Sequence, residues 1–145
     1  MGSRITPELA RLLNERKIMR AQIGEDMVFK EIEAAQTDLQ DAQDSLQMNK
    51  FKWATIQSYY SMFHSARALL FSKGYREKSH YALLLAIREL YSMELEPSLI
   101  SRFEEGMELR QEADYGSKFS ETGALDTIDG AEKLLFKAKE ILKNK

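Results

Sequence analysis

The chain has 145 residues, a length that supports a single domain with its own hydrophobic core. Hydrophobic residues make up 43% of it and charged residues 30%, with only seven glycines and two prolines, which favours an all-α fold. The absence of cysteine excludes disulfides, iron–sulfur clusters and thiolate zinc sites. The formal net charge of -2 provides no overall attraction to nucleic acid, so such binding would need a local basic surface.

The first helix is predicted to begin at Thr6–Glu8, because Thr caps free amides, Pro suits the first helical position and Glu complements the helix dipole. It is expected to run to about Gln22, so residues 1–23 are interpreted as an N-terminal helical extension. Gly24 is the predicted break before a second helix that extends to about Leu46.

The third helix is expected to be central, because its residues are apolar on most sides from Phe51 to Phe71. Gly74 is the expected left-handed cap behind it, and Ser79 the expected cap of a shorter helix. Pro97 opens a further helix that is predicted to continue to Tyr115.

A loop over residues 117–123 precedes the final helix, for which Thr122 or Asp126 is the expected cap. No segment alternates with period two for long enough to predict a strand. Residues 24–145 are therefore predicted to form one up-and-down bundle, with five to six helices in an all-α chain. We expect a cytoplasmic protein without membrane association, because the start lacks a signal-like apolar run and no stretch reaches about 18 consecutive apolar residues.

Two groups of residues are candidates for chemistry. Tyr60, His64, Arg67 and Phe71 step by four, three and four, and so share one stripe of the third helix. These polar groups are either hydrogen-bonded residues at the edge of the core or side chains that face a ligand.

In the second group, Arg110 and Asp114 stand four residues apart near the end of a helix. An ordinary ion pair of this kind contributes about 0.3–0.5 kcal/mol. Asp is unfavourable at a helix C-terminus, where it faces the negative end of the dipole, and this is a reason to look for a second role.

Four pieces of the sequence together resemble the HEPN domain family, in particular a branch of small prokaryotic proteins with an Arg-x-x-Ala-Asp-Tyr motif. They are Tyr59–Leu70, Lys73-Gly74, Ser79-His80 and Leu109–Gly116. The resemblance extends from about Phe29 to Lys143. It implies a helical bundle that forms a homodimer, with motif helices of both subunits lining a shared cleft.

The resemblance also implies a choice of functions. Many HEPN proteins are metal-independent endoribonucleases, in which a base deprotonates the ribose 2′-OH and an arginine holds the scissile phosphate. Others are partners of minimal nucleotidyltransferases in two-gene toxin–antitoxin modules, or inactive binding modules.

Arg110 matches the motif arginine of the family, but Asp114 stands where the motif histidine is expected. A carboxylate of ordinary pKa is a poor proton shuttle at neutral pH, and its charge repels phosphate. This departure favours binding over cleavage. His64 or His80 could supply an imidazole from another helix, although a single histidine is more often structural.

The leading prediction is an RNA- or nucleotide-binding component of a toxin–antitoxin-like module, paired with a minimal nucleotidyltransferase. The alternatives are a metal-independent endoribonuclease and a non-catalytic structural interaction module. No cofactor and no metal are expected, since the Glu-x-x-His spacing of Glu77 and His80 occurs once without a twin. The catalytic candidates are Arg110, Asp114 and His64, and the substrate-binding candidates are Arg67, Tyr115, Tyr60 and His80.

Overall fold

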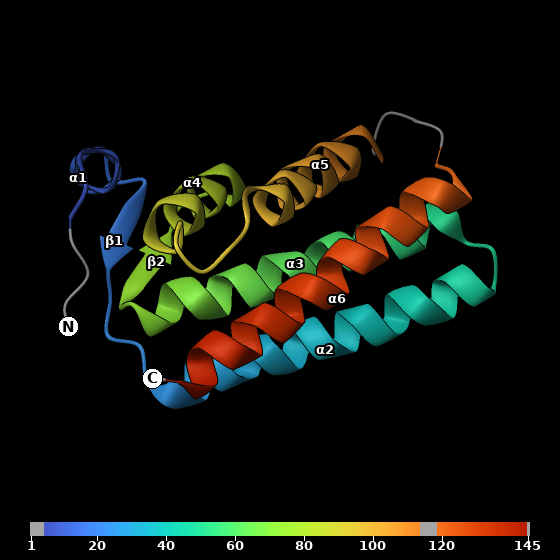
Figure 1. Cartoon of the computed structure of the whole chain (residues 1–145), viewed down its shortest axis with the longest axis horizontal. Coiled ribbons are helices and arrows are strands. Elements are labelled where there is room, and N and C mark those ends of the chain that lie inside the picture. Colours follow the sequence, from blue (N-terminus) through green and yellow to red (C-terminus); the bar gives the residue numbers. More distant parts are fainter. Residues whose placement is uncertain (1–4, 114–118, 145) are drawn as a thin grey trace.

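The computed structural model describes residues 5–113 and 119–144. These residues form six helices and one short sheet. The elements in chain order are α1 (Pro7–Asn14), β1 (Ile18–Arg20), α2 (Glu25–Gln47), α3 (Phe51–Ser72), β2 (Tyr75–Glu77), α4 (His80–Leu90), α5 (Pro97–Ala113) and α6 (Glu121–Lys143). Helices α2, α3 and α6 lie side by side along the molecule, and α4 and α5 follow one another along another side of α3 (Figure 1). The predicted all-α helical bundle is confirmed.

Helix α3 is the centre of the core, as its sequence predicts. Tyr59, Met62 and Leu69 are fully buried, and small polar residues allow neighbouring helices to approach. The hydroxyl of Ser61 donates to the Ala35 carbonyl of α2 at 2.8 Å, which satisfies a buried polar group across the helix pair. Helix α3 therefore presents side chains to every long helix around it.

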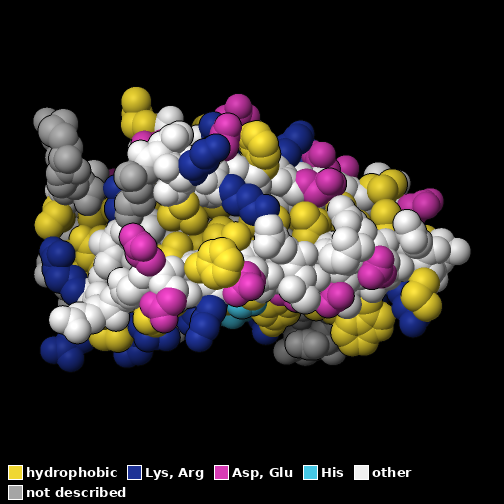
Figure 2. Space-filling view, turned by 90° about the horizontal axis from the view of Figure 1, so that it is seen from below, with side chains coloured by type: hydrophobic (Ala, Val, Ile, Leu, Met, Phe, Trp, Pro, Cys, Tyr) yellow, Lys and Arg dark blue, Asp and Glu magenta, His cyan; other side chains and the backbone are white. Residues whose placement is uncertain are grey.

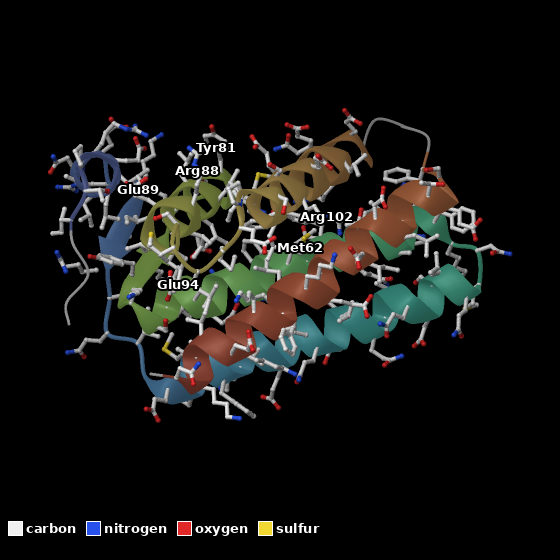
Figure 3. The ribbon with its side chains drawn as sticks, viewed as in Figure 1. Met62, Tyr81, Arg88, Glu89, Glu94 and Arg102 are labelled. Atoms are coloured by element: carbon white, nitrogen blue, oxygen red, sulfur yellow. The ribbon has the colours of Figure 1, made fainter. Side chains whose placement is uncertain are left out.

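The approach of α5 to α3 depends on Gly106. A Cβ atom at this position would lie 2.9 Å from the Cε atom of Met62 and 3.4 Å from Cδ1 of Tyr59. Met62 projects into the space between these helices and α6 (Figure 3). The small residue sets how closely the C-terminal half of α5 reaches the middle of α3.

The N-terminal segment differs from its prediction. Helix α1 ends at Asn14 rather than near Gln22, and Arg16 has a positive φ of 56°. The chain then enters β1, which pairs antiparallel with β2 in the register Ile18 to Glu77. The prediction of no strand was therefore wrong, because three residues are too few for period-two alternation to show.

This segment is part of the main core. Leu9, Leu12 and Ile18 are fully buried and belong to the same apolar cluster as the side chains of α3 and α4. The division into an extension of residues 1–23 and a bundle of residues 24–145 stays a prediction, but the two parts share one hydrophobic core.

Three of the four predicted helix caps are confirmed. The amide of Leu9 donates to Thr6 Oγ1 and that of Ala82 to Ser79 Oγ, each at 3.1 Å, and Gly74 has a φ of +84°. The cap of α6 was predicted wrongly. Ser120 fills this role in place of Thr122 or Asp126, because its extended backbone lets Oγ accept from the Gly123 amide at 3.0 Å.

The predicted end of α5 at Tyr115 lies outside the described residues. No helix in the described part of the chain is long and apolar enough to cross a membrane.

Candidate functional site

The C-terminal half of α5 and the first turn of α4 meet the middle of α3. Ser79 caps α4, so His80 is the first helical residue and lies against the aromatic side chains of α3. Arg110 lies one helical turn after Gly106, where α5 approaches α3 closely. Three successive helices therefore bring His80 and Arg110 to the same aromatic surface.

His80 is held on two sides. Its ring stacks on the ring of Phe63, with centroids 4.4 Å apart and an angle of 23°. Its Nδ1 atom lies 2.5 Å from the hydroxyl oxygen of Tyr59, which is fully buried. Burial lowers the pKa of His80, and the positive charges of Arg110 and Arg67 lower it further. Both effects favour the neutral imidazole.

Arg110 is the cation of this surface that lacks an acidic partner among the described residues. Its guanidinium lies 5.7 Å from the centre of the Tyr60 ring, and the same ring packs edge-on against His80 at 6.3 Å. Arg110 has no ion pair with any acidic residue of the described part of the chain. The predicted partner Asp114, and Tyr115 beside it, lie outside the described residues.

Arg67 has a different environment. Its guanidinium is packed between the rings of Phe63 and Phe71, at 5.4 and 5.2 Å from their centres. Its Nε atom lies 2.9 Å from Oε2 of Glu77, and Nη1 lies 3.9 Å from Oε1 of Glu31. Two carboxylates thus offset the charge of Arg67, so it is less suited than Arg110 to an external phosphate.

His64 faces helix α2. Its Nδ1 lies 2.9 Å from Oε1 of Glu31, and its Nε2 lies 3.6 Å from Oδ2 of Asp38. The structure therefore groups His64 with carboxylates, while His80 and Tyr60 share a surface with Arg110. Two acidic flanks make the His64 position unfavourable for binding a phosphate.

Sequence reasoning did not single out three residues of this region. Tyr59 entered only as part of the segment that resembles the family, Glu77 entered only through the spacing of a metal motif, and Glu31 was not a candidate. Each matters through a contact with a residue at least ten positions away. The apolar spacing of α3 and the resemblance of Tyr59–Leu70 to the family are the sequence signals that pointed towards Tyr59.

Other features of the surface lie apart from these residues. No group of three His, Asp or Glu residues that could hold a metal ion occurs among the described residues. A hollow of about 700 Å³ lies between α5 and α6 and includes Arg102 and Phe136, but none of the site residues. On the face shown in Figure 2, acidic and basic side chains are interspersed over the surface among exposed hydrophobic ones.

Comparison with known proteins places the chain in a family. The family model described as the HEPN domain matches residues 30–145. A UPF0332 protein of Archaeoglobus fulgidus is 31% identical over 111 residues, which cover 74% of this chain and 89% of that protein. The solved structure of TT1696 from Thermus thermophilus has a TM-score of 0.68 at 18% identity, covering 78% of this chain and 96% of that one, and supports the fold.

Two further relatives come from Methanocaldococcus jannaschii, and both bear the name "Putative toxin". MJ0605 is 31% identical over 118 residues, which cover 77% of this chain and 86% of the relative. MJ0142 is 31% identical over 101 residues, which cover 68% of each chain. Since the family model spans most of the sequence, and these relatives agree with it, the chain belongs to the HEPN domain family.

Proposed function

We propose that this chain is a toxin-like HEPN protein that binds the phosphate groups of RNA or of nucleotides between α3, α4 and α5. One observation carries the proposal. The guanidinium of Arg110 lies over the ring of Tyr60 and lacks an acidic partner among the described residues. A guanidinium that is not paired with a carboxylate can donate two parallel hydrogen bonds to phosphate oxygens.

The surroundings of Arg110 support the same ligand. Tyr60 places its aromatic ring beneath the cation, and His80 adds a ring nitrogen at the same surface. Aromatic rings stack on bases with little sequence preference. A phosphate on Arg110 with a base near Tyr60 would therefore use both kinds of group.

Cleavage of RNA is a second candidate. His80 lies close enough to Arg110 for that charge to lower its pKa, and a neutral imidazole is the form that can accept a proton from a ribose 2′-OH. Phosphate binding and RNA cleavage both need Arg110. They differ in whether His80 only contacts the ligand or also accepts a proton.

A direct experiment compares Arg110→Ala with Arg88→Ala. Arg88 is an exposed arginine on the side of α4 that faces away from α3, so its loss removes one positive charge without touching the site (Figure 3). Retention of single-stranded RNA on a filter at low salt should weaken about tenfold or more for Arg110→Ala, the value of a charged hydrogen bond. Arg88→Ala should bind within about twofold of the wild type.

The same samples are incubated with RNA and a chelator. Cleavage with 2′,3′-cyclic phosphate ends that disappears in Arg110→Ala would establish the endoribonuclease candidate. Equal RNA retention by both variants would contradict the phosphate site. If wild-type protein neither retains nor cleaves RNA, and Arg110→Ala is less stable, a structural role of Arg110 replaces the proposal.

The assembly is part of the proposal. We infer a homodimer and a minimal nucleotidyltransferase as partner, on the strength of family membership and of the toxin names of two relatives. Light scattering behind a sizing column measures whether the 16.8 kDa chain runs at twice its mass. Co-expression with a neighbouring nucleotidyltransferase, followed by pull-down and mass spectrometry, tests the partner and any modification of Tyr115.

A further inference from the structure

The contact between Tyr59 and His80 is partly buried and lies among packed aromatic rings. The Tyr59 ring is stacked against Phe103 on one side and near His80 on another, at centroid distances of 5.9 and 5.8 Å. The His80 ring is fixed in turn by Phe63. Neither ring can turn without losing a stacking contact, so the approach of the Tyr59 hydroxyl to Nδ1 at 2.5 Å is held by packing.

The direction of this hydrogen bond follows from the number of protons. The hydroxyl of Tyr59 has one proton, and burial raises its pKa above the ordinary value, so it keeps this proton at neutral pH. Nδ1 of His80 is the hydrogen-bond partner that the described residues offer to this hydroxyl. If Nδ1 carried a proton and donated, the buried phenolic proton would have no acceptor, and this state is the less favourable one.

A neutral imidazole that accepts at Nδ1 carries its proton on Nε2. Nε2 has no hydrogen-bond partner among the described residues. The N–H group at Nε2 is therefore a hydrogen-bond donor that none of the described residues uses. His80 and Arg110 thus both offer N–H donors to a ligand.

We propose that Tyr59 is a positioning residue that holds His80 with its proton on Nε2, so that His80 and Arg110 together donate hydrogen bonds to a phosphate and His80 does not act as a base. The inference rests on the proposed phosphate site and deepens it. The ligand class is a phosphate mono- or diester that is bound without deprotonation of a neighbouring hydroxyl.

The same arrangement separates the two candidate functions. A base for RNA cleavage must receive the 2′-OH proton on a nitrogen with a free electron pair. In His80 the free pair is on Nδ1, where the Tyr59 hydroxyl occupies it, and the protonated Nε2 has none to offer. The chain as described thus supports binding through His80 rather than catalysis by it.

The test measures the imidazole directly. The chain has two histidines, so ¹⁵N-labelled protein shows two imidazole pairs, and the His64→Gln variant assigns the pair of His80. In the wild type at neutral pH, Nε2 should give the resonance of a protonated ring nitrogen and Nδ1 that of an unprotonated one. In Tyr59→Phe, both tautomers should become populated.

Tyr91→Phe is the matched control for loss of a buried hydroxyl. Tyr91 is similarly buried, and its hydroxyl donates to the Leu69 carbonyl at 2.8 Å, away from His80. Affinity for 5′-AMP and for a short RNA should fall about five- to tenfold in Tyr59→Phe, as expected for one hydrogen-bond donor that is no longer fixed. In Tyr91→Phe it should stay within about twofold.

Each result has a consequence. Protonation of Nδ1 instead of Nε2 in the wild type would overturn the inference without any variant. An unchanged tautomer or unchanged affinity in Tyr59→Phe would show that Tyr59 does not position His80. If the wild type binds neither probe while its tautomer is as expected, the proposed function fails and only the tautomer assignment stands.

Discussion

Glu77 is the most buried carboxylate near the site. Two effects act on its pKa in opposite directions. Its side chain is only 5% exposed, and its Oε1 atom has no hydrogen-bond partner among the described residues. Burial raises the pKa of Glu77, while the guanidinium of Arg67 acts to lower it. Burial is the larger of the two, so the folded chain holds a proton on Glu77 more tightly than the unfolded chain does.

The stability of the protein should therefore depend on pH through Glu77. A carboxyl whose folded pKa is raised contributes stability below its unfolded pKa of about 4.5, and this stability is lost as the pH rises through the folded pKa. Glu77→Gln mimics the protonated form at every pH. In urea unfolding, the free energy of unfolding of the variant should thus gain on that of the wild type as the pH rises from 4 towards 7.

Glu33→Gln, at an exposed position of α2, controls for the loss of one negative charge. If the wild type instead gains on Glu77→Gln over the same pH range, the ion pair with Arg67 outweighs burial. The protein would then be stabilised by this pair at neutral pH, and Arg67 would be still less available to a ligand.

Strand β1 joins the N-terminal segment to the region of the site. It pairs with β2, which carries Glu77 and leads directly to the cap of α4 and to His80. The Lys78 amide donates to the Lys17 carbonyl at 2.9 Å, which extends the pairing beyond the strand. The N-terminal segment, which lies outside the match to the family model, thus supports the backbone that presents the histidine.

Ile18 and Met19 provide a matched pair within this strand. Ile18 is fully buried and Met19 is 45% exposed. Ile18→Ala should lower the free energy of unfolding by about 2–5 kcal/mol, because it leaves a cavity in the main core. Met19→Ala should change it by less than about 0.5 kcal/mol. Equal effects of the two variants in urea unfolding would show that the segment is not anchored in the core.

Helices were predictable from the sequence because their signals are local. The apolar steps of α3, the Thr6 and Ser79 caps and the left-handed Gly74 each depend on residues within one turn. The strand pairing could not be predicted from the sequence, because β1 and β2 are short and lie more than fifty residues apart. The same limit applies to the site, where Tyr59 meets His80 across 21 residues and no periodicity encodes that contact.

The whole molecule carries a formal charge of -2, so binding of RNA cannot come from its net charge. Of the two arginines predicted to hold phosphate, Arg67 is already paired with Glu77, and Arg110 is the cation without an acidic partner among the described residues. His80 is neutral and releases no counterion. Each site should therefore neutralise about one or two phosphates, few compared with proteins that bind along a basic face.

The salt dependence of RNA binding measures this number. For single strands the logarithm of the binding constant falls with the logarithm of salt concentration by about 0.7 per phosphate, so the slope should lie between about -0.7 and -1.4. Arg110→Ala should reduce it by about 0.7, while Arg88→Ala should leave it unchanged. A slope of about -4 or steeper in the wild type would require a broad basic surface, and the site built on Arg110 would then be at most one contact among several.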